Sequence, residues 1–246
     1  MKVVLPKEHG TWMMFFLPYG LGVVLSGPTL IHLPFLIGWF FLYLSTTPWL
    51  NQLRNAKLRE QMRPWAFTYT TIGLLFVFPV AAVFNPVLFL LGLVIIPFFA
   101  VSIWFVLHKK ERHLLNDVCG ITIFSLGLPA AYTLGESGMT AEAGQLFVMV
   151  VLYFTGSAFY VKSLIRERKN RAFTRKSHLY HTVLLILPLL VGWGPAHAWA
   201  YVPGVLKDWI TPRSNPVRPV KIGIVEIVNG MVFFVIVVSV NVFRPS

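Results

Sequence analysis

Four groups of ionisable and amide side chains lie beside long apolar runs, and their types suit acid–base, ion-pairing or anion-binding chemistry. The groups are Lys7, Glu8 and His9; Asn116 and Asp117; His178 and His181; and Glu226 with Asn229. An ionisable side chain at the centre of a membrane helix costs about 2.5–3.5 kcal/mol on insertion scales, so each one requires an explanation. We predict that the four groups form one polar site. In it, Asp117 and Glu226 are the catalytic or orienting carboxylates and the other groups bind a ligand.

The carboxylates also have structural interpretations. Glu8 and Asp117 stand where apolar runs begin, and helix N-termini favour acceptors and negative charge, so capping is the alternative for both. Glu226 lies about one turn into its run. A structural ion pair with Lys221 or Arg218 is the alternative for that residue.

His178 and His181 are three residues apart and therefore share one face of a helix. Two histidines alone do not make a zinc site, which takes four ligands or three with an open position. The spacing marks no third or fourth ligand. We expect hydrogen bonding near the membrane interface from both residues, and we predict neither a metal nor a cofactor.

The densest basic segment runs from residue 160 to residue 171. If its helix continues beyond the membrane, Lys162, Arg166 and Lys169 share a face. Arginine presents a planar donor fork to phosphate oxygens, so this face suits a diphosphate or a lipid head group. The alternative is that these charges only fix the topology of the loop.

Nine apolar runs position these residues. About 20 helical residues cross the roughly 30 Å of a bilayer's hydrocarbon, and the runs approach that length. The predicted spans are Gly10–Ser26, Leu30–Pro48, Trp65–Phe84, Pro86–Leu107, Asp117–Leu134, Gly144–Val161, Leu179–Gly194, Ala196–Ile210 and Ile222–Phe243. The sequence therefore predicts an all-α, polytopic transmembrane bundle that forms a single integral membrane domain over residues 1–246.

Basic residues alternate along the chain with almost uncharged connections. Of the 21 Lys and Arg residues, all except Arg244 lie in the N-terminal tail or in the connections after the second, fourth, sixth and eighth spans, or at their edges. Cytoplasmic loops retain Lys and Arg. We therefore predict a bacterial inner-membrane protein with its N-terminus in the cytoplasm and its C-terminus outside. The eighth span contains Lys207 and Asp208, but without that crossing the alternation would fail.

The composition excludes an ordinary soluble domain. Only 12% of the residues are charged, against about 25% in soluble proteins, and the mean hydropathy is +0.70. A net charge of +12 would suggest nucleic acid in a soluble chain. Here the cations lie in short loops beside spans, where topology and anionic lipid explain them. We predict the lipid bilayer as a partner and no nucleic acid, and no protein partner follows from the sequence.

Several motifs resemble the YwiC-like family of bacterial membrane proteins. They are the segment from Pro6 to Trp12, Asn116-Asp117 with Gly120 and the segment from Pro129 to Tyr132, and the segment from Tyr160 to Arg166. The similarity extends over most of the chain. It implies a class of membrane protein and no defined reaction.

A more distant resemblance is to the UbiA superfamily of intramembrane prenyltransferases, in the nine spans and in the long loops after the second and sixth. In that family, aspartate-rich motifs on those loops hold Mg²⁺, which needs oxygen ligands. Here the loops are basic and contain no Asp-x-x-x-Asp pair. We therefore expect a UbiA-like bundle that binds an isoprenoid or lipid phosphate directly. The predicted contacts are Lys7, His9, Lys162 and Arg166, oriented by Asp117 and Glu226.

Three functions are compatible with this pattern. The first is an enzyme of isoprenoid or lipid metabolism, or a degenerate relative of one that lacks the metal motifs. The second is a small-molecule transporter that uses the same polar groups beside broken helices. The third is a non-catalytic partner of another membrane protein.

Overall fold

A computed structural model describes residues 4–6, 9–135 and 138–243, with the side chain of His9 excluded. Those residues form helices and connections, with no strand among them. The helices are α1 (His9–Ser26), α2 (His32–Arg54), η1 (Ala56–Leu58), α3 (Arg59–Val83), α4 (Val87–Leu107), α5 (Leu114–Ser125), α6 (Gly127–Leu134), α7 (Ala141–Leu164), α8 (Arg171–Leu190), α9 (Pro195–Ala198), η2 (Trp199–Tyr201), α10 (Val202–Ile210) and α11 (Pro219–Val242). The predicted all-α class is confirmed.

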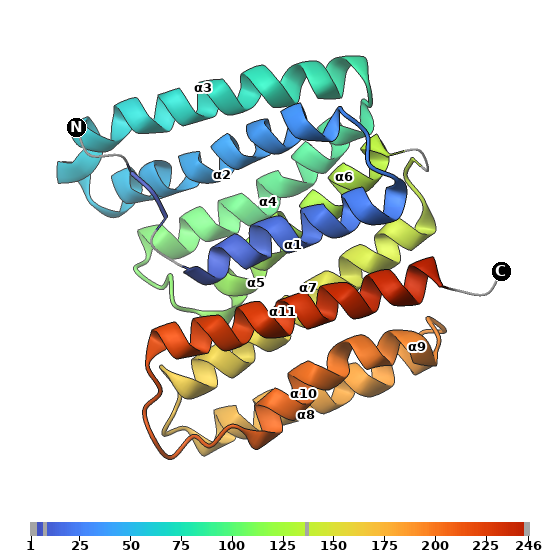
Figure 1. The fold of residues 1–246 in the computed structure, drawn as a ribbon. Helices are drawn as coiled ribbons and strands as arrows, with labels where there is room; N and C mark the ends of the chain where they lie inside the picture. Colours follow the sequence, from blue (N-terminus) through green and yellow to red (C-terminus); the bar gives the residue numbers. More distant parts are fainter. Residues whose placement is uncertain (1–3, 7–8, 136–137, 244–246) are drawn as a thin grey trace.

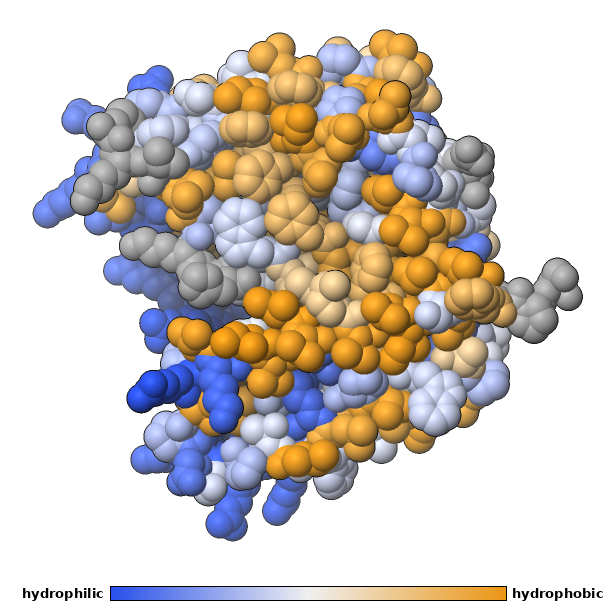
Figure 2. Space-filling view, viewed as in Figure 1, coloured by the Kyte–Doolittle hydropathy of each residue, from blue (hydrophilic) through white to orange (hydrophobic). Residues whose placement is uncertain are grey.

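The helices run back and forth along one direction and form a bundle (Figure 1). The start of α1 and the connections α2–α3, α4–α5, α7–α8 and α10–α11 lie at one end, on the left of the view. We call this the basic end, because these connections carry the basic stretches of the sequence. Figure 2 shows hydrophilic residues gathered at this end and a broad hydrophobic band across the rest of the face.

Within the described residues, six helical segments are long and apolar enough to cross a membrane. They are α2, η1 with α3, α4, α5 with α6, α7 and α11. These correspond to predicted spans two to six and nine. The three other predicted spans correspond to α1, α8 and the α9–η2–α10 segment, which lie within the same bundle (Figure 1). That they also cross the bilayer remains a prediction.

Two predicted spans differ in form from the structure. The fifth is divided between α5 and α6 at Leu126. Pro129 explains the break, because it has no N–H to donate to the carbonyl of Ser125, four residues earlier. The eighth is also broken, at η2, and Pro203 lies in the first turn of α10.

One condition on a helix end is not met, and one predicted helix start was wrong. The helix over the sixth span ends at Leu164, so Arg166 and Lys169 do not share a helical face with Lys162. The seventh helix begins at Arg171 rather than near Leu179. Asn170 starts it by accepting a hydrogen bond from the backbone N–H of Phe173 at 3.1 Å, as an N-cap does.

The largest apolar core joins α1, α5, α6, α7, α8, η2 and α11. Its members include the fully buried Leu21, Leu146 and Phe233. At the centre, α1 approaches α6 so closely that a Cβ built on Gly22 would lie 2.8 Å from the Cβ of Ala131. Small residues allow such close approach of membrane helices. Helix α1 also packs against α11, and α6 packs against α7.

Candidate functional site

A buried carboxylate forms the centre of a polar cluster near the basic end. Asp208, on α10, is fully buried. Its Oδ2 lies 2.6 Å from His178 Nδ1, its Oδ1 accepts a hydrogen bond from Ser177 Oγ at 2.8 Å, and Arg213 forms an ion pair with it. His181 Nδ1 lies 3.5 Å from the same carboxylate. A buried charge is tolerated only when it is paired and hydrogen-bonded, and Asp208 is both.

Neighbouring helices supply these partners. Helix α8 packs against α10, and the three-residue spacing of His178 and His181 turns both rings toward it. The His178 ring stacks on Trp209 with 4.6 Å between ring centroids. Arg213 follows α10 and reaches back to Asp208, and it also donates to Ser163 Oγ on α7. The cluster therefore joins α7, α8 and α10.

A second ion pair lies beside the first. Lys207 Nζ is 2.5 Å from Glu226 Oε1, and Ser157 Oγ donates to the other oxygen of the same carboxylate. The Lys207 ammonium also lies 4.4 Å from the ring centroid of Tyr160, in a cation–π contact. Glu226 is thus paired with Lys207, and not with Lys221 or Arg218 as the sequence suggested.

A third pair links α5 to the end of α7. Lys162 Nζ lies 2.6 Å from Asp117 Oδ2 and donates to the backbone carbonyl of Arg112 at 2.5 Å. The Lys162 side chain is 8% exposed, so its charge is held by Asp117 within the protein. His113 is the N-cap of α5, and its side chain accepts a hydrogen bond from the backbone N–H of Leu115. Asp117 lies in the first turn but is not the cap.

The other predicted site residues are distributed differently. Asn116 donates to the carbonyl of Glu111 at 2.9 Å, and Arg166 is exposed. Lys7, Glu8 and the side chain of His9 lie outside the described residues. The structure thus brings His178 and His181 to Asp208, Lys162 to Asp117, and Glu226 to Lys207.

The sequence interpretation missed the residues at the centre of the cluster. Lys207 and Asp208 were used only to argue the topology of the eighth span, and Arg213 only as a loop charge. The sequence did contain one indication of their importance. Lys207 and Asp208 are adjacent ionisable residues inside an apolar run, and such residues are candidates for a functional site by default. No local pattern indicates that their partners lie on α7, α8 and α11.

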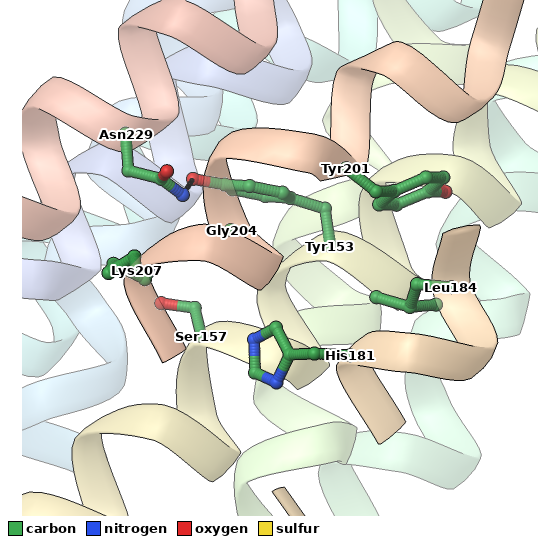
Figure 3. Close-up of a pocket in the computed structure, with 8 residues that line it drawn as sticks. All are labelled: Tyr153, Ser157, His181, Leu184, Tyr201, Gly204, Lys207 and Asn229. Atoms are coloured by element: carbon green, nitrogen blue, oxygen red, sulfur yellow. Dashed lines mark hydrogen bonds between the residues drawn. The ribbon is translucent and has the colours of Figure 1, made fainter. Parts of the chain in front are cut away.

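A small cavity lies beside His181, which is within reach of Asp208, and Lys207, which pairs with Glu226 (Figure 3). It is lined by Tyr153, Ser157, His181, Leu184, Tyr201, Gly204, Lys207 and Asn229. Its volume is about 10 Å³, which is about what one water molecule requires. At its inner side Asn229 Nδ2 donates to Tyr153 Oη at 2.7 Å, as Figure 3 shows.

A larger groove of about 260 Å³ lies between α2, α3 and α4. Its lining is Trp49, Gln52, Leu53, Arg59, Phe99 and Ile103. Trp49 is fixed by a 3.0 Å hydrogen bond from its indole N–H to Thr70 and by edge contact with Phe67. Among the described residues that line the groove, Arg59, at the start of α3, is the charged one. The groove thus combines apolar walls with a cation near the basic end.

The part of the chain that the structure describes contains no group of three or more His, Cys, Asp or Glu side chains arranged to hold a metal ion. Both histidines of the cluster are instead within reach of Asp208.

Over the residues that the structure describes, the chain is a helical bundle with six membrane-length apolar helices and with charged residues gathered at one end, as in an integral membrane protein. The YwiC-like protein family matches residues 5–132, and the chain belongs to this family. It is 39% identical over 237 residues to the uncharacterized protein YwiC of Bacillus subtilis (strain 168), covering 96% of this chain and 97% of that protein. An uncharacterized protein of Haemophilus influenzae is 31% identical over 236 residues, covering 96% and 98%.

No solved structure matches this chain. The predicted resemblance to the YwiC-like family is confirmed. The predicted UbiA-like arrangement of the helices stays a prediction.

Proposed function

We propose that this protein binds the anionic head group of an amphipathic molecule, an isoprenoid or lipid phosphate, at the groove between α2, α3 and α4. The observation that carries the proposal is the position of Arg59 among the apolar side chains of that groove. A phosphate would lie against the guanidinium and a hydrocarbon chain against Trp49 and Phe99. Such a groove would hold the charged head group and the apolar chain of an amphipathic ligand in two different environments, as the surface and the interior of a bilayer do.

The charges of the groove favour an anion held without a metal. Its lining includes Arg59 and Gln52 and no carboxylate. Mg²⁺ requires oxygen ligands, typically carboxylates, whereas arginine binds phosphate directly through its donor fork. This supports a protein that is degenerate relative to metal-dependent prenyltransferases. The volume of about 260 Å³ is below the usual 300–1,000 Å³ of ligand pockets, so the groove would enclose only part of such a molecule.

The proposed cation differs from those that the sequence suggested. Lys162 is buried against Asp117, so a phosphate would have to displace that carboxylate. Arg166 is exposed beyond the end of α7 and remains available to a head group at the basic end. Asp117 and Glu226 each hold a lysine, which supports an orienting role for both carboxylates within the bundle.

Replacing Arg59 with glutamine should weaken binding of phosphatidic acid and of farnesyl phosphate by about tenfold or more. A hydrogen bond to a charged group contributes about 1.5–3 kcal/mol. Arg63→Gln is the matched control, because Arg63 is also exposed on α3 but lies outside the groove and over the Phe67 ring. Binding is measured on the purified full chain in detergent by native mass spectrometry.

Inorganic phosphate is the third probe. It should bind much more weakly than either lipid, because it makes no contact with the apolar walls. Equal losses in the two arginine variants would mean that only general surface charge attracts these lipids. Unchanged lipid binding by the Arg59 variant would remove the proposed site.

The orientation is part of the proposal. With the basic end in the cytoplasm of a bacterium, the N-terminus lies inside and the C-terminus outside the inner membrane. Single cysteines placed at residues 57 and 169, in a Cys119→Ser background, should react with a membrane-impermeant maleimide only after the cells are opened. A cysteine at residue 138 should react in intact cells. Labelling of the first two in intact cells would reverse the orientation.

A further inference from the structure

The polar cluster leads inward from the basic end. The His178 side chain is 23% exposed, whereas Asp208 is fully buried and His181 is 3% exposed. Because α8 runs away from the basic end, His181 lies one turn deeper than His178 (Figure 1). The carboxylate of Asp208 lies 2.6 Å from the Nδ1 atom of His178 and 3.5 Å from the Nδ1 atom of His181. One residue with access to water is thus connected to a histidine that has almost none.

The cavity continues this path. His181 Nδ1 lies 2.9 Å from the carbonyl oxygen of Ser177, which fits donation by Nδ1–H and leaves Nε2 as an acceptor on the other side of the ring. That ring lines the cavity together with Ser157 and Lys207 (Figure 3). Ser157 and Lys207 both bind Glu226. One water molecule in the cavity would therefore stand between the Asp208 group and the Glu226 group.

The size of the cavity limits what the cluster accepts. About 10 Å³ holds one water molecule and excludes any organic substrate. The charges beside it are already paired, so an inorganic ion would have to break a buried ion pair. A proton needs no volume, and chains of Asp, Glu and His inside membrane proteins commonly carry protons.

The path ends at apolar packing. Beyond the Asn229–Tyr153 hydrogen bond, Tyr153 stacks on Phe233 with 4.1 Å between ring centroids. Tyr201 donates its hydroxyl to the carbonyl of Met149 at 3.1 Å, and Leu184 closes the same side. In this conformation the titratable side chains of the path are therefore connected to the basic end, and apolar packing separates them from the opposite end.

Charged, titratable and hydroxyl side chains from four helices form the path and its surroundings. From α7 and α8 they are Ser157, Tyr153, Tyr160, His178, Tyr180 and His181; from α10, its following loop and α11 they are Lys207, Asp208, Arg213 and Glu226. Arg213 forms an ion pair with Asp208, and Lys207 forms one with Glu226. Both carboxylates therefore remain acceptors for a proton on a neighbouring group.

We infer that this cluster is a proton relay, the basic-end half of a proton path across the bundle, and that the apolar packing around Tyr153 closes the path in this conformation and moves apart to complete it. A proton on the cavity water adds to His181 Nε2, and the Nδ1 proton of His181 moves to Asp208. Asp208 passes it to His178 Nδ1, and the Nε2 proton of His178 leaves to water at the basic end. Each transfer breaks one N–H or O–H bond and forms another, so the relay needs no other reactant. It uses α7, α8, α10 and α11, and is independent of the groove between α2, α3 and α4.

The test is proton uptake by liposomes that contain the purified full chain. The vesicles hold pyranine, and a potassium gradient with valinomycin makes their interior negative. We expect wild-type vesicles to acidify several times faster than protein-free vesicles. Asp208→Asn and His178→Gln should each slow this uptake by about tenfold or more, because each variant removes one proton-transfer group from the path.

His108→Gln is the control. His108 is exposed at the end of α4, where its ring bonds the Trp104 carbonyl and stacks on the Trp104 ring, away from the cluster, so its variant should keep the wild-type rate. If Asp208→Asn does not elute as a folded protein, His178→Gln and His181→Gln decide the question. Wild-type uptake equal to that of empty vesicles would overturn the relay, and so would wild-type rates in both folded histidine variants.

Discussion

Replacing Asp208 with alanine should lower the free energy of unfolding by about 3–5 kcal/mol, the usual loss when one partner of a buried ion pair is removed. Arg213 would remain partly buried with no carboxylate beside it, and Ser177 Oγ and His178 would lose their acceptor. Unfolding in detergent micelles, followed by circular dichroism, measures the effect. Asp208→Asn should lose less stability, because its amide oxygen still accepts from Ser177.

Glu111→Ala provides the comparison for this first prediction. Glu111 pairs with Arg54 at the basic end, where the two side chains are 28% and 50% exposed. Exposed pairs contribute about 0–1 kcal/mol, so this variant should be nearly as stable as the wild type. Similar stabilities for Asp208→Ala and Glu111→Ala would mean that the Asp208 cluster does not hold α8 and α10 together.

Replacing Gly22 with alanine should also destabilise the bundle, by about 1–3 kcal/mol, the range for overpacking a well-packed core. The added Cβ would lie 2.8 Å from the Cβ of Ala131 and 3.1 Å from the backbone nitrogen of Tyr132. The carbonyl oxygen of Leu128 is closer still. Because backbone atoms cannot move aside alone, α1 and α6 would have to separate. The same unfolding measurement tests this.

Gly120→Ala is the matched control for the glycine variant. Gly120 also lies within a helix, but a Cβ there meets nothing within 4 Å. Since alanine favours helix by about 0.8–1.0 kcal/mol over glycine, this variant should be neutral or slightly more stable. A Gly22→Ala protein as stable as Gly120→Ala would show that α1 and α6 have room to adjust.

Most of the helices could be predicted because hydrophobic length is a local property. Predicted spans such as Pro86–Leu107 coincide within a residue with α4, Val87–Leu107. Helix ends outside the apolar runs were less predictable. The start of α8 at Arg171 depends on a cap at Asn170 in a polar segment that hydropathy does not delimit. The basic connections were correctly grouped, since alternate connections must lie at the same end of an antiparallel bundle.

The candidate site was only partly predictable. His178, His181 and Glu226 were recognised because ionisable groups beside or within apolar runs are rare and costly. Their partners were not, because the choice depends on which helices lie side by side. Glu226 and Ser157 are 69 residues apart in sequence, and Arg213 and Ser163 are 50 apart. Nothing local distinguishes Lys207 from Lys221 as the partner of Glu226.

The sequence by itself determined that this protein is a helical membrane protein with its cations at one end, because apolar length and the placement of charge set the free energy of each segment in a bilayer. The tertiary structure alone decided that Asp208, on a short and broken helix, is the centre of the polar cluster. It also decided that Arg59, rather than Lys162, lines a groove with apolar walls. Both outcomes depend on contacts between helices distant in the chain, and helix packing selects those contacts.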